Sequence, residues 1–458
     1  MLANPSYVYL GTAVSGVIFH LSIFIRGEWH MQAPTLATTY DASSYVIGLF
    51  ASIIVYRKCF HRLCHFSGSW IAGATKVWHL RKQYGPVIRT GPEDLTIIDA
   101  AVPPAIDGPG NECTNAVWYD FLLPEIALNT TRSIKDHNAR RRTWDRGFSP
   151  KTLDTYEERV VEYAETLTAQ IEKLAHTGAP FNRWHFAVRL LRKAMSLLGP
   201  FSPVPWIAQM AFYITPWMYI VRDWLAMMQW CRDRISERIQ AKVRRLDVSH
   251  WLIDASLQKG SLEADREWLN GDAVTIIIAG SDTIAPTLVF AFYELARKHR
   301  YIRSCSASKL FSPNGNYKRN SALYPPVPTG GYRQSPPSGM TINDIYIPGN
   351  VTIVTPRYPL ARLDSSYECA DQLVPERWTS RPEMVKDTQG VAPFSQGRFN
   401  CVGKSLAMSE MRFVIALLMK KFKVEFWGDD KGEKLFAYLR DRFTAAPGRL
   451  DLRFRVKG

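Results

Sequence analysis

A single cysteine, Cys401, lies in a loop with a glycine on each side, Gly397 and Gly403, and an apolar, helix-forming segment follows directly. Because glycine has no Cβ, the loop backbone can pass close to a flat ligand. The start of the following helix, with its free N–H groups and positive dipole end, favours an anionic sulfur. Lys404 and Arg398 add positive charge nearby. The pattern predicts a thiolate that is presented to a metal, rather than a buried cysteine after a turn.

The same loop resembles the haem-binding loop of the cytochrome P-450 superfamily, Phe-x-x-Gly-x-Arg-x-Cys-x-Gly. Four positions match it at the expected spacing, namely Phe394, Gly397, Cys401 and Gly403. Phe399 takes the place of the arginine, and Arg398 lies one residue earlier, a variant that some members tolerate. The resemblance implies that Cys401 is the axial thiolate of a haem b iron, a ligand that favours cleavage of the O–O bond.

A long helical stretch is predicted over residues 271–298, and an unusual polar pair, Asp282 and Thr283, lies in its apolar centre. Both side chains compete for backbone hydrogen bonds, and Pro286 removes the N–H that would bond to Asp282. We therefore expect a kink there. The segment resembles the family's oxygen-binding motif, which implies that Thr283 holds a water and that Asp282 relays protons. The alternative is a helix bend whose polar side chains bond to backbone carbonyls.

Three basic residues are candidates for contacts with the haem propionates. His137 and Arg141 belong to a basic helix that resembles the family's Trp-x-x-x-Arg helix, and Arg333 follows the proline-stiffened run at residues 323–328. In the family, this run lines the substrate pocket, and an arginine near its end holds a propionate. An arginine fork suits a carboxylate. A solvated basic face is the alternative for the helix, because further arginines lie close by: Arg140, Arg142 and Arg146.

The Glu-x-x-Arg helix that the family carries before the proline run has no counterpart in this sequence. Its arginine position holds Ala322 and its glutamate position holds Arg319, in a polar, loop-like region. Arg377, in a Pro-Glu-Arg-Trp segment, would then lose its buried carboxylate partner, at a cost on the order of 3–5 kcal/mol. Misassigned exon borders and a truly degenerate family member both remain explanations.

Composition and the resemblance together define the expected architecture. No polar linker divides the 458 residues, of which 46% are hydrophobic, so we expect one large domain behind an N-terminal segment. The resemblance implies a mainly α fold with small β-sheets (α+β), with some core helices missing. The net charge of +15 suits an anionic membrane or an acidic protein partner. Nucleic-acid motifs are absent, and seven scattered cysteines fit a reduced, cytosol-facing protein.

The N-terminus predicts a membrane anchor. Residues 7–25 are almost entirely apolar and approach the roughly 20 residues that cross a bilayer. A second, shorter run at 44–56 is either another span or an interfacial helix. Basic residues follow it and place the remaining chain in the cytosol: Arg57, Lys58, His61 and Arg62. We expect an anchor over residues 1–62 and a haem domain over 63–458. The resemblance adds the endoplasmic reticulum membrane.

The expected activity is that of a haem-thiolate monooxygenase, which inserts one atom of O₂ into an apolar small molecule, in the manner of fungal enzymes of secondary metabolism. Electrons would come from NADPH through a flavoprotein reductase docked on the basic surface. Two alternatives remain. A haem-thiolate isomerase or dehydratase needs no proton relay, so Asp282 and Thr283 argue against it. A catalytically inactive, membrane-anchored member is supported by the lost Glu-x-x-Arg helix.

Overall fold

The computed structural model describes residues 62–63, 66, 85–177, 212–241, 246–297, 323–378, 380–390 and 392–457. The apolar runs at 7–25 and 44–56, and the positions of Arg319 and Ala322, lie outside the described residues. The chain divides into two compact units, and the larger comprises Trp78–Ile88 and Glu93–Gly458. In the smaller unit, the Arg89 guanidinium donates to the carbonyls of Gly91 and Pro92, at 3.2 and 3.0 Å.

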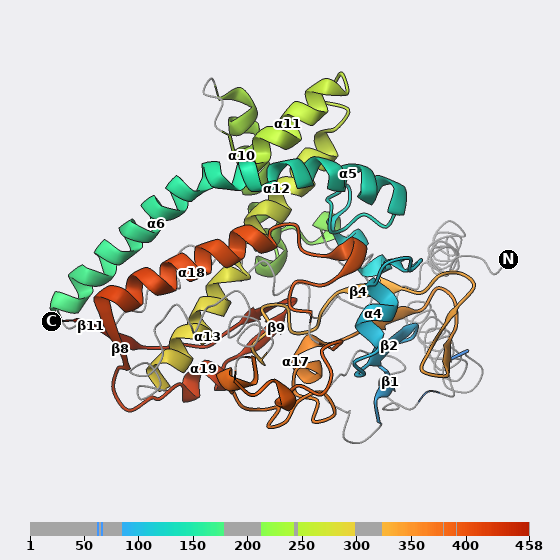
Figure 1. The fold of residues 1–458 in the computed structure, drawn as a ribbon. Helices are drawn as coiled ribbons and strands as arrows, with labels where there is room; N and C mark the ends of the chain where they lie inside the picture. Colours follow the sequence, from blue (N-terminus) through green and yellow to red (C-terminus); the bar gives the residue numbers. More distant parts are fainter. Residues whose placement is uncertain are drawn as a thin grey trace, which may run out of the picture. The chain divides into compact units, whose positions relative to one another are not determined.

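Helices dominate the larger unit (Figure 1). They are α4 (Val102–Asp107), α5 (Ile134–Gly147), α6 (Pro150–Thr177), α10 (Tyr219–Gln240), α11 (Val248–Gln258), α12 (Arg266–Ser281), α13 (Ile284–Arg297), α17 (Arg357–Leu360), α18 (Lys404–Lys421) and α19 (Glu433–Ala437). Short 3-10 turns occur at Val117–Leu122 (η2), Pro375–Trp378 (η4), Pro382–Met384 (η5) and Gly397–Phe399 (η6). Side-chain caps begin two helices, because Ser133 accepts from the Asp136 N–H and Asp247 from the His250 N–H.

Within the described residues, the strands form one five-stranded sheet and three small pairs. The larger sheet has the order β1 (Val87–Arg89), β2 (Asp94–Ile97), β7 (Thr352–Val354), β4 (Tyr332–Gln334) and β3 (Thr114–Asn115). In it, β2 and β7 are parallel, whereas β4 is antiparallel to both β7 and β3. The pairs are β5 (Met340–Ile342) with β6 (Ile345–Ile347), β8 (Phe422–Phe426) with β11 (Leu452–Val456), and β9 (Arg440–Arg442) with β10 (Thr444–Ala446). The expected mainly α fold with small sheets is confirmed.

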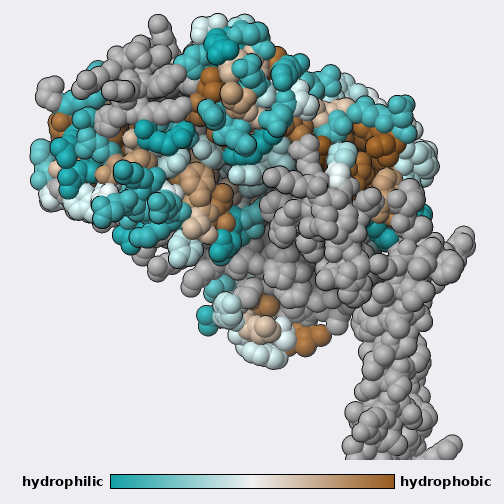
Figure 2. Space-filling model, turned by 90° about the horizontal axis from the view of Figure 1, so that it is seen from below, coloured by the Kyte–Doolittle hydropathy of each residue, from teal (hydrophilic) through white to brown (hydrophobic). Residues whose placement is uncertain are grey.

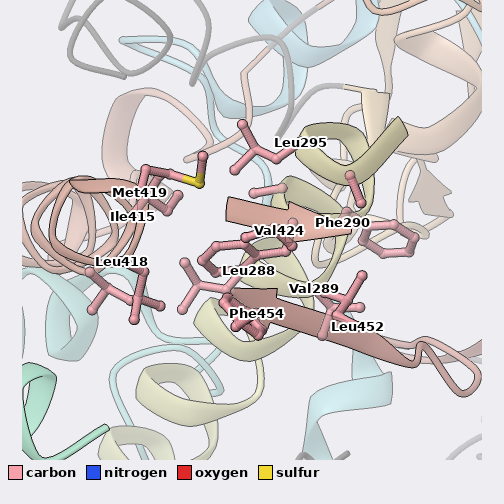
Figure 3. Close-up of a cluster of buried hydrophobic side chains, with 14 of the residues drawn as sticks. Leu288, Val289, Phe290, Leu295, Ile415, Leu418, Met419, Val424, Leu452 and Phe454 are labelled. Carbon is pink, nitrogen blue, oxygen red and sulfur yellow. The ribbon is translucent and has the colours of Figure 1, made fainter. Parts of the chain in front are cut away.

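The main core forms where α13 packs against α18 and β8 (Figures 1 and 3). In Figure 3, Leu288 of α13 and Phe454 of β11 lie in the middle of the cluster, with Ile415 and Leu418 of α18 on one side and Phe290 of α13 on the other. Each such buried side chain contributes about 1.5–3 kcal/mol through the hydrophobic effect. This packing fixes α18, the helix that follows the cysteine loop, against the helical stretch that carries Asp282 and Thr283.

The long helical stretch breaks where the sequence predicts. Helix α12 ends at Ser281 and α13 begins at Ile284, so Asp282 and Thr283 lie between the two. Pro286 has no N–H for the Asp282 carbonyl. At the next residue, the carbonyl of Thr283 accepts from the Thr287 hydroxyl, at 2.7 Å. The polar pair therefore lies at a defined bend.

One described stretch, Arg266–Arg297, which contains α12 and α13, is long and apolar enough to cross a membrane. Of its most apolar window, 44% is buried inside the protein. Among the described residues that Figure 2 colours, hydrophilic residues predominate on this face, and hydrophobic residues form groups between them.

Candidate functional site

The cysteine loop has a backbone that requires glycine at one position. Gly397 has a φ of +57°, and a Cβ there would lie 1.9 Å from the carbonyl oxygen of Asp107 in α4. The loop therefore packs directly onto α4, which no other residue type would permit. The Cys401 N–H donates to the carbonyl of Phe394 at 2.7 Å, and this bond closes the loop before α18 begins at Lys404.

The Cys401 side chain is accessible to solvent although protein surrounds it closely. Burial is the strongest influence and raises the pKa of the Cys401 thiol above its usual value. The Gly403 N–H and the cations of Arg357, Arg141 and Lys404 act in the opposite direction. The expected anion-favouring effect of Lys404 is thus present, but burial outweighs it in the protein alone. Burial disfavours the free thiolate of Cys401, and a metal ion bound to the sulfur would stabilise that thiolate.

Phe399, which replaces the family's arginine, is the point at which two predicted site residues meet. The guanidinium carbon of Arg333 lies 3.9 Å from the centre of the Phe399 ring, a cation–π contact. The His137 ring packs edge-on against the same ring, with 5.2 Å between centroids. Tertiary packing therefore brings His137 of α5 and Arg333 of β4 into contact with Phe399, which precedes Cys401 by two residues.

Arg333 is buried, and two of its guanidinium nitrogens donate to polar side chains. Its Nε donates to Asp107 at 2.7 Å and its Nη1 donates to Asn115 at 2.8 Å. Burial lowers the pKa of Arg333, but Asp107 and Tyr119 outweigh it and raise the pKa above its usual value. Asp107 also accepts from the Ser395 hydroxyl at 2.9 Å. Sequence reasoning missed Asp107, because nothing in the short helix α4 indicates a partner 226 residues away.

His137 and Arg141 also lie at the cysteine loop, as the sequence predicts. His137 is buried, and burial lowers its pKa, so its ring is held in the neutral form. The Arg141 Nη1 donates to the Asn400 carbonyl at 2.8 Å, and its Nε donates to Asp145 at 2.7 Å. Arg141 therefore links α5 directly to the residue before Cys401.

Arg140 departs from the solvated basic face that was the alternative for α5, whereas Arg142 and Arg146 are exposed as that alternative predicts. The Arg140 side chain is buried, with Nε 2.6 Å from Asp272 and Nη1 2.9 Å from Asp265. The Trp144 indole also donates to Asp272, at 3.2 Å. This network binds α5 to α12 and thereby fixes His137 and Arg141 relative to the helix bend.

Asp282 and Thr283 occupy different environments at the bend. The Asp282 carboxylate is buried and accepts from the hydroxyl of Thr444 in β10. The Thr283 hydroxyl donates to the Ala279 carbonyl at 2.6 Å, as the helix-bend alternative predicts. Its oxygen keeps lone pairs that can accept from a water. Sequence reasoning missed Thr444, which lies 162 residues further along the chain.

Arg377 lacks a carboxylate within the described part of the chain, in agreement with the sequence-based expectation. The side chain is fully buried, and its Nη2 donates to the carbonyls of Glu368 and Cys369. Its Nε and Nη1 have no hydrogen-bond partner among the described residues. Burial lowers the pKa of Arg377 to about 10.

Glu294 and Arg297 have the Glu-x-x-Arg spacing at the end of α13, far from the proline run in sequence. The structure brings Glu294 to that run, since the Tyr324 hydroxyl donates to its carboxylate at 2.8 Å. Arg297 Nη2 lies 2.7 Å from the other carboxylate oxygen. The pair braces the proline run against α13, but it does not reach Arg377 through any contact among the described residues.

A separate cavity of about 870 Å³ lies on another face of the bend. Its described lining comes from α6, α11, α18 and the α12–α13 stretch, and includes Ser281, Ile284 and Glu410. Neither Cys401 nor Thr283 contributes to this lining. The cavity is therefore distinct from the site around the cysteine.

The donor set around Cys401 fits a haem. The loop offers one accessible thiol, and the basic groups of Arg141, Arg333 and Arg398 lie around it. Arg398 Nη2 donates to the Asn111 carbonyl at 3.1 Å, whereas its buried Nη1 has no partner among the described residues. A buried, orphaned guanidinium nitrogen beside such a loop is suited to a carboxylate of a bound group.

Comparison with known proteins identifies a family. The family profile described as cytochrome P-450 matches residues 323–445. The cytochrome P-450 monooxygenase orf5 of Eupenicillium brefeldianum is 32% identical over 466 positions, covering 90% of this chain and 94% of that protein. The tryprostatin B 6-hydroxylase of Aspergillus fumigatus is 29% identical, covering 91% of each chain. The solved structure of retinoic-acid-bound cyanobacterial CYP120A1 covers 82% of this chain and 93% of its own, with a TM-score of 0.64 and 18% identity.

The alignments also bear on the segments expected to be missing. The match to the tryprostatin B 6-hydroxylase extends over 512 aligned positions, more than the 458 residues of this chain. That relative therefore has residues without a counterpart in this chain.

Proposed function

The chain belongs to the cytochrome P-450 family, and on this basis we propose that Cys401 is the axial ligand of its haem iron. The protein is a monooxygenase like its fungal relatives in secondary metabolism. The observation that carries the assignment is the accessible Cys401 thiol, which receives the Gly403 N–H and lies among cations. When bound, the haem supplies the activation of O₂, and the cysteine thiolate tunes it.

Basic side chains around the loop would hold the haem carboxylates. Arg141 and Arg398 present guanidinium groups beside the loop, and Arg333 lies over Phe399. His137, neutral because of its burial, would donate one ring N–H. Phe394 and Gly397 would shape the loop rather than contact the haem carboxylates. The carbonyl of Phe394 accepts from the Cys401 N–H, and Gly397 allows the loop to pack closely on α4.

Proton movement is assigned to the helix bend. The Thr283 hydroxyl oxygen would accept a hydrogen bond from a water while the hydroxyl continues to donate to the Ala279 carbonyl. Asp282, whose carboxylate is held by Thr444, would exchange protons with that water. This pair favours a monooxygenase over an isomerase or dehydratase, which needs no proton delivery.

The remaining assignments concern partners and place. The haem domain would comprise residues 63–458 behind an anchor at 1–62, in the endoplasmic reticulum membrane with the catalytic domain in the cytosol. NADPH would supply electrons through a flavoprotein reductase that docks on the basic surface. The substrate would be an apolar small molecule, as the family resemblance implies.

The CO difference spectrum of the reduced, membrane-bound protein tests the ligand assignment. We expect the Soret band of a thiolate-ligated haem for the natural chain, and its complete loss in Cys401→Ala. Cys369→Ala, at another exposed cysteine, is the matched control and should retain the band. A thiolate band that persists in Cys401→Ala would refute the ligand, and a featureless spectrum from well-expressed natural protein would refute haem binding by this chain.

A further inference from the structure

The β9–β10 hairpin has a strained, one-residue turn. Thr444 lies opposite Arg442 in the register of the two strands, so Phe443 alone makes the turn. Phe443 has a φ of +70°, in the left-handed region that bulky side chains rarely adopt. Such strain persists only where the surrounding structure holds it in place.

Aromatic packing holds the Phe443 side chain. Its ring stacks on Trp118, with 4.8 Å between centroids and an interplanar angle of 25°. It also lies nearly parallel to the ring of Tyr332, at 6.5 Å and 18°. Trp118 and Tyr332 stack on one another at 4.7 Å, so the turn residue extends an existing aromatic cluster.

Hydrogen bonds hold the hairpin backbone. The Asp441 carboxylate accepts from the N–H of Phe443 and from the hydroxyl of Thr329. The N–H of Ala445 donates to the carbonyl of Pro326 at 2.8 Å, which ties β10 to the proline run. The turn is therefore fixed on both sides, and the next residue, Thr444, has little freedom to move.

Thr444 uses this fixed position to contact the bend. Its side chain is buried, and its hydroxyl donates to Asp282. A hydroxyl has one proton to give, so this bond orients one carboxylate oxygen of Asp282. Asp282 is the C-cap of α12, and its N–H donates to the Ile278 carbonyl at 2.9 Å, so the end of the helix holds its backbone and the Thr444 hydroxyl holds its side chain.

We infer that Thr444 is a positioning residue, which holds the Asp282 carboxylate in the orientation that proton delivery requires. The strained turn at Phe443 sets the place of the hydroxyl. The inference rests on the proposed proton role of Asp282 and extends it to a residue in a distant hairpin. A purely structural tie between the hairpin and the bend is the competing explanation.

The experiment compares four variants of the full-length, haem-loaded protein, reduced by NADPH and a flavoprotein reductase in the presence of the aromatic ether ethoxycoumarin. They are Thr444→Val, Thr444→Ser, Asp282→Asn and the control Thr168→Val, which removes another buried hydroxyl, in α6. The measurement is the fraction of reducing equivalents released as hydrogen peroxide. We expect this fraction to rise several-fold in Thr444→Val and Asp282→Asn. In these variants proton delivery would be too slow for substrate oxidation, and more of the reducing equivalents would leave as hydrogen peroxide. Thr444→Ser and Thr168→Val should match the natural protein.

A second measurement does not depend on activity. Amide hydrogen exchange should become faster around Asp282 and in β10 when Thr444→Val removes the bond, and Thr444→Ser should restore protection. Thr168→Val should change exchange only in α6.

The outcomes distinguish the positioning role of Thr444 from the proton role of Asp282. If Asp282→Asn leaves the peroxide fraction unchanged, the proton role of Asp282 is wrong, and the inference falls with it. If Asp282→Asn raises the fraction but Thr444→Val does not, only the positioning role is wrong. If Thr444→Ser behaves like Thr444→Val in both measurements, the tie is structural and the inference is overturned.

Discussion

Single residues at this site differ most in how their charges are balanced. Arg333 is buried beside Asp107, and the carboxylate keeps the guanidinium charged. Arg377 is buried equally well, but among the described residues it finds only backbone carbonyls. Replacing a buried charge that lacks a counter-ion by an apolar side chain is often neutral or stabilising. The two arginines should therefore respond to substitution in opposite directions.

We predict that Arg377→Met leaves the free energy of unfolding unchanged or raises it by about 1–3 kcal/mol. Because burial lowers the pKa of Arg377 to about 10, the unfolded state binds the proton more tightly than the folded state does. Stability of the natural protein should then rise as pH increases from about 10 toward the usual arginine value, and Arg377→Met should lose this rise. Urea unfolding at several pH values measures both effects. A loss of several kcal/mol would instead indicate an anionic partner outside the described residues.

At the scale of elements, one buried network aligns α5 with α12. Arg140 bonds to Asp272 and Asp265, and Asp272 also accepts from the Leu128 N–H at 3.1 Å. Burial raises the pKa of Asp272, although Arg140 opposes it. The network therefore works only if every member is present, since each lost partner leaves a buried polar group unpaired.

We predict that Asp272→Asn lowers the free energy of unfolding by about 3–5 kcal/mol, because the buried Arg140 then loses one of its two carboxylates. The matched control is Asp233→Asn in α10, where the carboxylate is exposed and accepts from Gln229. We expect a change within about 0.5 kcal/mol for this control. Chemical denaturation of both variants makes the comparison, and equal, small losses would show that the network does not hold the two helices together.

For the whole molecule, charge is the property that governs encounters. A net charge of +15 creates a field that attracts acidic proteins and anionic membrane surfaces. A flavoprotein reductase with an acidic docking face would be steered toward this protein.

We predict that the rate of haem reduction by the reductase falls steeply as ionic strength rises from about 0.01 to about 1 M, since the screening length shrinks from roughly 30 to 3 Å. Stopped-flow reduction under CO measures the rate. The final amplitude of the CO band is the internal control and should be independent of salt. A rate that does not depend on salt would exclude electrostatic docking.

Features set by neighbouring residues were predictable from the sequence. The cysteine loop and the break between α12 and α13 follow from glycine conformations and from the missing N–H of Pro286, which act over a few residues. The assignment of His137, Arg141 and Arg333 to one place came from family resemblance, and the structure brings all three to the loop. The alternative of a solvated basic face for α5 holds for the exposed Arg142 and Arg146 but not for the buried Arg140, because spacing along a helix does not say what covers each position.

Partners of the site residues were decided by tertiary structure alone. Arg333 meets Asp107, Asp282 meets Thr444 and Arg140 meets Asp272, and each pair joins elements more than 100 residues apart. Which polar side chains meet depends on how α4, α5, α12 and the hairpin pack. Many residues far apart determine that packing together. The sequence by itself therefore determined the chemistry of Cys401 and the local backbone around it. The tertiary structure decided which charges are balanced, because burial makes an ionic partner necessary without indicating where along the chain it lies.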